Sequence, residues 1–312
     1  MAHQDLVRGK VVSHFVVDKK LGEGGFGQTY SVIDQETHQM YAMKIEYMNS
    51  PNKVLTNEIR VLYELRGNPH FPQFIDDGVE DDFFFVVMDI FGPSLSKMRK
   101  RMSGNKFSLT KTLTLGIEML HAIEALHEKG YVHCDIKPSN FLVSPRPEHS
   151  LVLIDFGLSE KFIDRNTHSI RSYKNDCGFV GTYTYSSVHV HKGKRYSPRD
   201  DLISWFYSLI EMAKGSLPWD TPMDPADMKS AKERISFIKI CRHLPIEFDK
   251  IYLYLKKLKY SSKPNYGIIE HFLKSAIKKT DENVIMEENR EFNMAMNLRS
   301  SGTSQMSAQI SL

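Results

Sequence analysis

The character of the sequence changes near residue 93, and this change constrains the fold more than any other feature. Between residues 11 and 90, short runs of β-branched and aromatic residues alternate with Gly, Asn and Asp, which is typical of strands joined by turns. One helical stretch, residues 55–65, interrupts them. After Pro93 the apolar residues recur every three to four positions, as in residues 113–130, which predicts helices. The sequence therefore predicts an α+β fold.

Composition narrows the class of protein. The 312 residues are 41% hydrophobic and 25% charged, which is ordinary for one large or two smaller globular domains. A net charge of +3 argues against a nucleic-acid binder. Three cysteines without a C-x-x-C pair argue against a disulfide framework or a zinc module.

The ends of the sequence give further expectations. The N-terminus has no apolar signal region, no apolar run approaches the roughly 18 residues that span a bilayer, and Ala2 replaces the glycine needed for myristoylation. We therefore expect no membrane association, and a cytoplasmic location that extends to the nucleus. Residues 1–10 form an N-terminal extension, and the polar residues 281–312 predict a flexible tail.

Three glycines form the first motif. Gly22, Gly24 and Gly27 have G-x-G-x-x-G spacing, which lets backbone amides approach phosphate oxygens. A plain hairpin turn remains an alternative. A dinucleotide-binding fold would need a helix directly afterwards, but residues 28–34 are strand-like. We expect a flap between two strands.

A lysine within an apolar strand forms the second motif. Lys44 would be costly there as an unpaired ammonium. Glu58, in the next helix, is placed to pair with it, and Lys44 shares a strand face with Ala42. A surface lysine on an edge strand is the alternative.

The third motif combines a carboxylate, a cation and an amide. Asp135 is followed by Lys137 and then by Asn140, after His133. Phosphoryl transfer needs an acceptor for the hydroxyl proton, a positive group at the γ-phosphate and an oxygen ligand for the metal. The order of these residues argues against a chance loop.

The fourth motif is a carboxylate at the end of an apolar strand. Asp155 follows such a strand and precedes Phe-Gly, twenty residues after Asp135. A carboxylate there suits a Mg²⁺ ligand beside the phosphates.

Together the four motifs resemble the signature of protein kinases, over roughly residues 11–280. The resemblance implies a bilobal fold with a small β-rich N-lobe, residues 11–90, and a larger helical C-lobe, residues 93–280. It also implies ATP, Mg²⁺ and protein substrates with Ser or Thr acceptors. A pseudokinase scaffold is the main alternative, and the complete chemical set argues against it. Lys137 disfavours a tyrosine-specific or small-molecule kinase.

Several segments are similar to the casein kinase 1 group in particular. These are Phe-Gly-Pro-Ser-Leu at 91–95, Lys-Pro-Ser-Asn-Phe-Leu at 137–142, Gly-Thr and Tyr-Ser-Ser within 181–187, and the absence of an Ala-Pro-Glu motif. Residues 244–266 are most similar to the tau-tubulin kinase branch.

The resemblance assigns roles to residues of this sequence. It implies that Asp135 is the catalytic base, that Lys44 pairs with Glu58, and that Lys137 steadies the γ-phosphate. Thr182 would position the acceptor, and Asn140 and Asp155 would hold magnesium. Nucleotide contacts, with Met88 as gatekeeper, are implied for Leu21, Gly22, Glu23, Gly24, Gly25, Phe26, Gly27, Tyr30, Ala42, Lys44, Met88, Asp89, Ile90, Phe91, Asn140, Leu142 and Asp155.

One further carboxylate is ambiguous. The resemblance implies that Asp201 braces the catalytic loop from a buried helix. A simple helix N-cap is the alternative for the same residue. We expect the protein to act as a monomer.

Two departures from the family pattern carry expectations about regulation and specificity. Cys134 replaces the usual arginine before the catalytic Asp, and a cysteine cannot pair with a phosphorylated loop residue, so we expect activity without activation-loop phosphorylation. An inert, buried thiol is favoured over a reactive one. Thr184 replaces an arginine of an anion pocket, so we expect a weaker preference for acidic or phosphorylated substrates. Four nearby cations could compensate, or they could form only a solvated face: Lys192, Lys194, Arg195 and Arg199.

Overall fold

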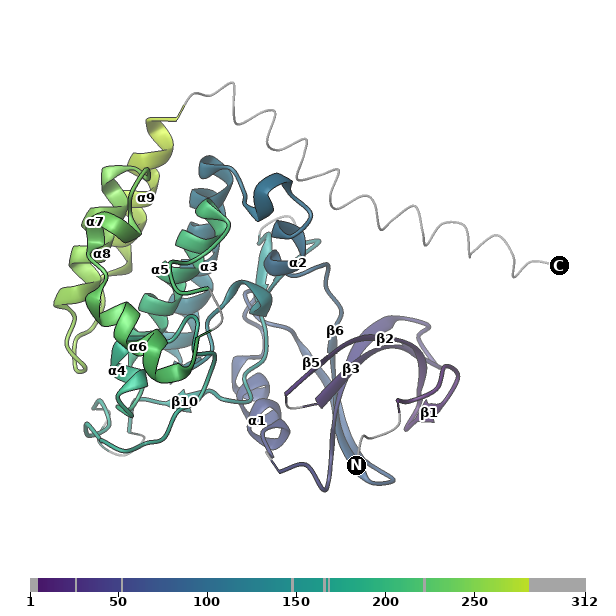
Figure 1. The fold of residues 1–312 in the computed structure, drawn as a ribbon. Coiled ribbons are helices and arrows are strands. Elements are labelled where there is room, and N and C mark those ends of the chain that lie inside the picture. The colour runs from purple at the N-terminus through teal and green to yellow at the C-terminus, as the bar shows by residue number, and fades with distance from the viewer. Residues whose placement is uncertain are drawn as a thin grey trace. The chain divides into compact units, whose positions relative to one another are not determined.

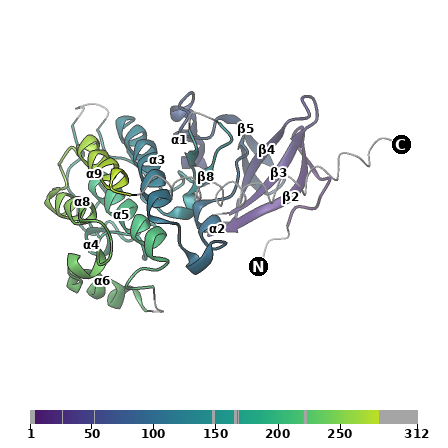
Figure 2. The same ribbon diagram turned by 90° about the horizontal axis from the view of Figure 1, so that it is seen from above.

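The computed structural model describes residues 5–25, 27–51, 53–146, 149–164, 167, 169–220 and 223–280. These residues form two compact units, shown as ribbons in Figures 1 and 2. The first contains residues 5–91 and 152–159, and the second contains residues 92–151 and 160–280. Phe26 and the tail predicted for 281–312 lie outside the described residues.

The first unit is built on an antiparallel sheet whose six strands have the order β1-β2-β3-β4-β6-β5. The sheet is curled, as Figure 1 shows. One helix, α1 (Leu55–Leu65), accompanies it. The strands are β1 (Val11–Val12), β2 (Phe15–Gly24), β3 (Gly27–Asp34), β4 (Met40–Tyr47), β5 (Phe74–Glu80) and β6 (Phe83–Asp89).

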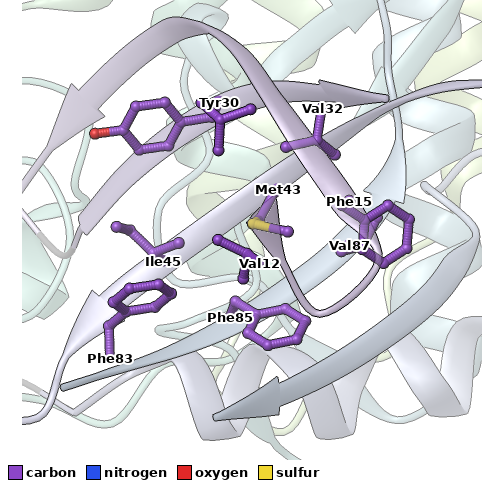
Figure 3. Close-up of a cluster of buried hydrophobic side chains, with 10 residues drawn as sticks. Val12, Phe15, Tyr30, Val32, Met43, Ile45, Phe83, Phe85 and Val87 are labelled. Atoms are coloured by element: carbon purple, nitrogen blue, oxygen red, sulfur yellow. The ribbon is translucent and has the colours of Figure 1, made fainter. Parts of the chain in front are cut away.

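Strand β4 separates the apolar core of this unit from its polar face. Met43 and Ile45 are fully buried in the core, and because side chains alternate along a strand, Lys44 projects to the opposite face. Lys44 is opposite Thr29 on β3, and Ala42 is opposite Met88 on β6. The core cluster, drawn in Figure 3, contains Val12, Phe15, Tyr30, Val32, Met43, Ile45, Phe83, Phe85 and Val87.

The second unit is mainly helical. Its largest helix, α3, contacts α5 and α9, and Trp205 of α5 donates its indole N–H to the carbonyl of Gly116 on α3 at 3.0 Å. The helices are α2 (Leu95–Arg99), α3 (Leu109–Glu128), α4 (Val188–His191), α5 (Pro198–Lys214), α6 (Pro225–Arg234), α7 (Phe237–Ile240), α8 (Ile246–Lys257) and α9 (Tyr266–Lys278).

Short elements complete the second unit. Two are 3₁₀ helices, η1 (Ser103–Asn105) and η2 (Pro138–Asn140). Strands β7 (Tyr131–Val132) and β10 (Glu160–Lys161) pair in an antiparallel manner. Strand β8 (Phe141–Val143) also belongs here, and β9 (Leu151–Leu153) ends in the first unit.

The predicted α+β class is confirmed, because a sheet-based unit and a helical unit are both present. The motif glycines lie in a flap, with Gly24 of β2 opposite Gly27 of β3, rather than before a helix. None of the helices within the described ranges is long and apolar enough to cross a membrane.

Candidate active site

The glycine flap is open above its first glycines. A Cβ atom placed on Gly22, Gly24 or Gly25 would meet no heavy atom within 4 Å. At Gly27, by contrast, φ is +152° and a Cβ would lie 2.1 Å from the carbonyl oxygen of Ile45. Gly27 is thus required by the backbone, whereas the other three leave the space that a close phosphate approach needs.

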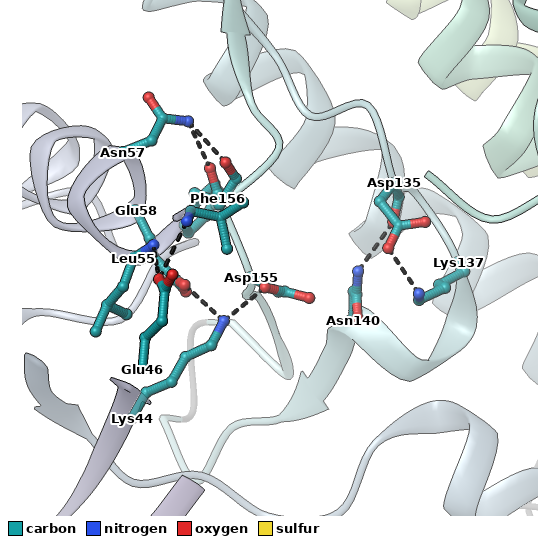
Figure 4. A network of polar contacts seen from close by, with 12 residues as sticks. Lys44, Glu46, Leu55, Asn57, Glu58, Asp135, Lys137, Asn140, Asp155 and Phe156 are labelled. Carbon is teal, nitrogen blue, oxygen red and sulfur yellow. Dashed lines mark hydrogen bonds and ion pairs between the residues drawn. The ribbon is translucent and has the colours of Figure 1, made fainter. Parts of the chain in front are cut away.

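Within the first unit, one ammonium group lies between two carboxylates, and we call Lys44, Glu58 and Asp155 the Lys44 cluster. Lys44 Nζ donates to Glu58 Oε2 at 2.6 Å and to Asp155 Oδ1 at 2.7 Å. Figure 4 shows both contacts. Glu58 is 1% exposed, on the buried face of α1. The predicted pairing of Lys44 with Glu58 is present in the geometry.

Charge and burial shift the ionisation of this cluster. Burial lowers the pKa of Lys44, but the charges of Asp155 and Glu58 outweigh it and hold that pKa above its ordinary value. Burial raises the pKa of Glu58, and Lys44 only partly opposes this because Asp155 also adds a negative charge. One cation thus lies within hydrogen-bond distance of two carboxylates.

Within the second unit, three side chains form a closed triangle, and we call Asp135, Lys137 and Thr182 the Asp135 cluster. Lys137 Nζ donates to Asp135 Oδ2 at 2.6 Å and to Thr182 Oγ1 at 2.8 Å. The Thr182 hydroxyl donates to Asp135 Oδ1 at 2.7 Å. Both carboxylate oxygens of Asp135 are thereby oriented, which a positioned general base requires.

A buried aspartate on α5 braces the loop that carries Asp135. Asp201 is fully buried and accepts the backbone N–H groups of His133 at 2.7 Å and of Cys134 at 3.0 Å. It also accepts a hydrogen bond from Nε2 of His127 at 2.9 Å, while Nδ1 of His127 lies 2.5 Å from the Tyr266 hydroxyl. The bracing role expected for Asp201 fits these contacts.

The alternative role, capping of α5, belongs to the neighbouring residue. The Asp200 carboxylate accepts the backbone N–H of Ser197 at 3.0 Å and its hydroxyl at 2.9 Å, and forms the capping box with Ser197. The Asp201 carboxylate is therefore available to accept the backbone N–H groups of the loop that carries Asp135. Ser187 also donates its hydroxyl to Asp200 at 2.6 Å.

Gly181 lets the segment that carries Thr182 approach this loop closely. Its φ is +93°, and a Cβ atom there would lie 2.4 Å from the carbonyl oxygen of Cys134 and 3.6 Å from Asp135 Oδ1. Only glycine fits this position without displacement. The glycine therefore sets the Thr182–Asp135 contact.

Cys134 is a structural residue in this loop. Its side chain is 1% exposed, its φ is +70°, and burial raises the pKa of its thiol well above the ordinary value. A protonated, enclosed thiol is a poor nucleophile. The geometry agrees with the expectation of an inert cysteine.

The residues expected to surround the adenine are distributed over both units. Ala42 and Met88 are neighbours across β4 and β6, and both are nearly buried. Asp89 Oδ2 accepts the backbone N–H of Gln73 at 3.2 Å. The remaining residues are half-buried: Leu21, Ile90 and Phe91 in the first unit and Leu142 on β8 in the second.

Two of the expected nucleotide contacts are engaged elsewhere. Tyr30 is fully buried in the core cluster, opposite Met43 rather than Lys44, so it faces away from the Lys44 cluster and we correct that expectation. Its hydroxyl accepts the backbone N–H of Leu6. Glu23 is exposed and pairs with Lys20 at 2.6 Å.

The donors expected to hold magnesium fit a hard cation. Asn140 is 5% exposed and donates its amide Nδ2 to the backbone carbonyl of Asp135 at 2.9 Å, which leaves the side-chain oxygen as the atom suited to a cation. Asp155 supplies a carboxylate on a backbone with φ of +71°. Carboxylate and amide oxygens are the ligands that Mg²⁺ prefers.

Comparison with known proteins now decides the family. The family described as "Protein kinase domain" matches residues 15–286. The chain belongs to the protein kinase family. The kinase domain is also 35% identical, over 270 residues, to a probable serine/threonine-protein kinase of Dictyostelium discoideum. That match covers 86% of this chain and 54% of the relative, so the chain spans about half the length of the curated protein it matches.

Sequence reasoning missed two polar side chains of the kinase domain that lie beside the Lys44 cluster. Glu46 shares the face of β4 with Lys44, two residues away, and accepts the backbone N–H of Leu55 at 2.6 Å. A carboxylate in an apolar strand was the available signal. Asn57, directly before Glu58, gave no such signal, because the carbonyls to which its amide donates lie about 100 positions away.

Proposed function

We propose that this chain is a serine/threonine protein kinase, which transfers the γ-phosphoryl group of ATP to a serine or threonine hydroxyl of a protein. The observation that carries the proposal is the complete chemical set, with Lys44 between two carboxylates and Asp135 held by Lys137 and Thr182. A pseudokinase would be expected to lack at least one of these groups.

The residues of the first unit would handle the phosphates. Lys44 carries the positive charge that binds phosphate oxygens, and the open glycines of the flap allow backbone amides to approach them. Asp155 and Asn140 would hold Mg²⁺, which supplies charge neutralisation at the phosphates. Glu58 fixes the direction of the Lys44 side chain.

The Asp135 cluster would handle the acceptor. Asp135 would orient the substrate hydroxyl and take its proton, while Thr182 and Lys137 hold one carboxylate oxygen each. Because phosphoryl transfer has a loose transition state, orientation and electrostatics contribute more than proton abstraction. Lys137, as a cation beside the base, would also stabilise charge on the transferred group.

A transfer assay with radiolabelled ATP tests this proposal. Casein, tau and tubulin serve as substrates for the unaltered chain and for the Asp135→Asn and Lys44→Met variants. We expect incorporation with the unaltered chain and a loss of about 10²–10⁴-fold in Asp135→Asn. Undiminished transfer in either variant would refute the assigned roles, and an unaltered chain that transfers nothing would favour the pseudokinase scaffold.

We also propose that the chain is a member of the casein kinase 1 group, most similar to its tau-tubulin kinase branch. The support is the sequence of the segments at 91–95, 137–142, 181–187 and 244–266. In the first of these segments, the Ser94 side chain caps α2 by accepting the N–H of Lys97.

We propose that activity does not need phosphorylation of the activation loop. Two cations in or next to the loop already have protein acceptors: Arg171 donates to the carbonyl of Lys161, and Arg195 to that of Ser172, each at 3.1 Å. Cys134 offers no charge to a phosphate. We expect the combined variant Thr167→Val, Ser169→Ala, Ser172→Ala and Tyr173→Phe to keep kcat within about twofold, and a folded but inactive variant would refute the proposal.

We propose a weak preference for phosphorylated substrates. Thr184 stands where the resemblance implies an arginine, and its carbonyl accepts the indole N–H of Trp219 at 2.8 Å. The nearby cations also have partners. Arg199 is 6% exposed and contacts Asp200, and Lys192 pairs with Glu233 at 2.7 Å. Peptides with phosphoserine or alanine upstream of the acceptor should give similar kcat/KM, and a large phosphoserine preference would contradict this.

We further propose a kinase domain of residues 11–280, with lobes at 11–90 and 93–280, that works as a monomer in the cytoplasm and the nucleus. The support is the extent of the sequence resemblance and the composition. Sedimentation of the purified chain tests the monomer directly.

A further inference from the structure

Asn57 of α1 connects that helix to the loop that follows Asp155. Its side-chain Nδ2 donates to the backbone carbonyls of Gly157 at 2.9 Å and of Ser159 at 3.0 Å, as Figure 4 shows, and lies 3.4 Å from that of Phe156. All of these residues belong to the first unit. Together with Glu58, whose carboxylate accepts the backbone N–H of Phe156, this side chain ties α1 to the loop of Asp155.

A second side chain sets the orientation of this amide. Arg60, one turn further along α1, donates its guanidinium N–H to Asn57 Oδ1 at 2.6 Å. Because a guanidinium can only donate, it selects the oxygen of the amide and directs the NH₂ group to the loop. The contact to the two carbonyls is thus supported from the helix itself.

The loop also packs closely on the first turn of α1. A Cβ atom on Gly157 would lie 3.1 Å from the Cβ of Val54, so the backbone of the loop is within side-chain contact of the helix start. Phe156 packs edge-to-face on Phe71, with ring centroids 5.6 Å apart. These contacts place Asp155, directly before Phe156, at one end of a fixed loop.

The helix is in turn fixed to β4. Glu46 is 3% exposed, and its Oε2 accepts the backbone N–H groups of Leu55 at 2.6 Å and Val54 at 3.1 Å. Because α1 has no side-chain cap of its own at Val54, Glu46 satisfies its first amides. Glu46 and Lys44 project from the same face of β4, so strand, helix and loop form one connected set.

We propose that Asn57 is a positioning residue, which holds the Asp155 loop on α1 so that Glu58 and Asp155 contact Lys44 together in the unphosphorylated chain. This inference rests on the proposed function, and it explains how the Asp155 loop is positioned without phosphorylation. Without the amide donor, the loop loses its two carbonyl contacts to α1, and the Phe156 backbone N–H with the Glu58 carboxylate is left to hold it.

The decisive variant is Asn57→Leu, which keeps the approximate volume and removes the donor. Two lost hydrogen bonds of ordinary strength predict a loss of about tenfold in kcat/KM, with a raised KM for magnesium–ATP and a smaller change in kcat. The matched control is Thr56→Leu, at the exposed neighbouring position of the same helix, which should leave both constants within about twofold. Asn57→Gln, which retains a donor, should recover part of the loss.

Hydrogen exchange separates positioning from general stability without relying on activity. In Asn57→Leu, the amides of residues 156–159 should exchange about tenfold faster, whereas those of the sheet, such as Met43, should keep their rates. Uniform acceleration over both regions would show that Asn57 only stabilises the fold, and unchanged rates would overturn the proposal. Both results are independent of whether the chain transfers phosphate.

Arg60 supplies the final test. Arg60→Met should lower kcat/KM about threefold by itself and should add nothing in the Asn57→Leu background, because it acts through the amide. Additive losses would contradict this arrangement. If the unaltered chain transferred no phosphate, the proposed function would fail, while the exchange rates would still decide whether Asn57 holds the loop.

Discussion

The Lys44 cluster and the Asp135 cluster are assembled in opposite ways. In the first, the partners of Lys44 are 14 and 111 positions away along the chain, and one cation lies between two carboxylates. In the second, Lys137 is two positions from Asp135, and a buried aspartate holds the backbone amides of the same loop. One cluster depends on charge balance and the other on a rigid backbone.

This difference predicts how each cluster responds to change. The ion pairs of Lys44 join side chains from a strand, a helix and a loop, so these contacts should rearrange readily when ligands bind. The loop of Asp135 has its amides and its base oriented before any ligand arrives, which lowers the reorganisation needed for reaction. Variants in the two clusters should therefore fail in different ways.

The largest effect is expected for Asp201→Asn. The substitution removes a buried charge that accepts hydrogen bonds from two backbone amides and His127, and an amide cannot accept them all. We expect the free energy of unfolding, measured by chemical denaturation, to fall by about 3 kcal/mol.

Glu58→Gln is the matched variant in the Lys44 cluster. Because burial already raises the pKa of Glu58, removal of its charge should lower the free energy of unfolding by only about 1 kcal/mol. Equal losses for the two variants would show that both clusters depend on charge to the same degree.

A pair of glycines gives the next effect. Gly181→Ala introduces a Cβ 2.4 Å from the carbonyl of Cys134, at a φ of +93°, and should cost about 1–3 kcal/mol of unfolding free energy as well as most of the transfer activity. Gly24→Ala meets open space and should stay within about 0.5 kcal/mol. Thermal unfolding of both measures this, and a larger loss at Gly24 would reverse the comparison.

The last effect concerns the pH dependence of stability. In Lys44→Met, Glu58 loses the cation that opposes its raised pKa, so the folded state binds more protons than the unfolded state above the ordinary value of 4.5. The free energy of unfolding must then fall as the pH rises through the raised pKa of Glu58. We expect this fall to be about 1 kcal/mol larger in Lys44→Met than in the unaltered chain.

Unfolding midpoints between pH 5 and pH 8 test this slope. The double variant Lys44→Met with Glu58→Gln removes the titrating group and should restore a flatter profile. Parallel curves for Lys44→Met and the unaltered chain would contradict the role of charge balance in this cluster.

The two clusters also differ in how far the sequence could predict them. The sequence could predict the group formed by Asp135, Lys137 and Asn140, because these residues lie within one loop at a spacing that is typical of phosphoryl transfer. Lys44 and Glu58 could be paired because the apolar strand made an isolated ammonium improbable. The α+β class followed from the change in periodicity near Pro93.

The features that the sequence did not predict depend on contacts between residues that are far apart in the chain. Asp201 could brace or cap from its sequence position, and only the structure assigns the cap to Asp200. Tyr30 was placed on the nucleotide side, but strand parity puts it opposite Met43 in the core. Residues 152–159 belong to the first unit although they follow residues 92–151 of the second unit in the chain. A division of the sequence into contiguous segments cannot predict this.

The central claim is that Lys44 serves the nucleotide and Asp135 serves the acceptor. Calorimetric titration of magnesium–ATP into Asp135→Asn and Lys44→Met, beside the unaltered chain, tests it most directly. Asp135→Asn should bind with a Kd within about threefold of the unaltered chain while transferring phosphate about 10²–10⁴-fold more slowly. Lys44→Met should bind at least about tenfold more weakly. Weakened binding in Asp135→Asn together with full affinity in Lys44→Met would contradict the account.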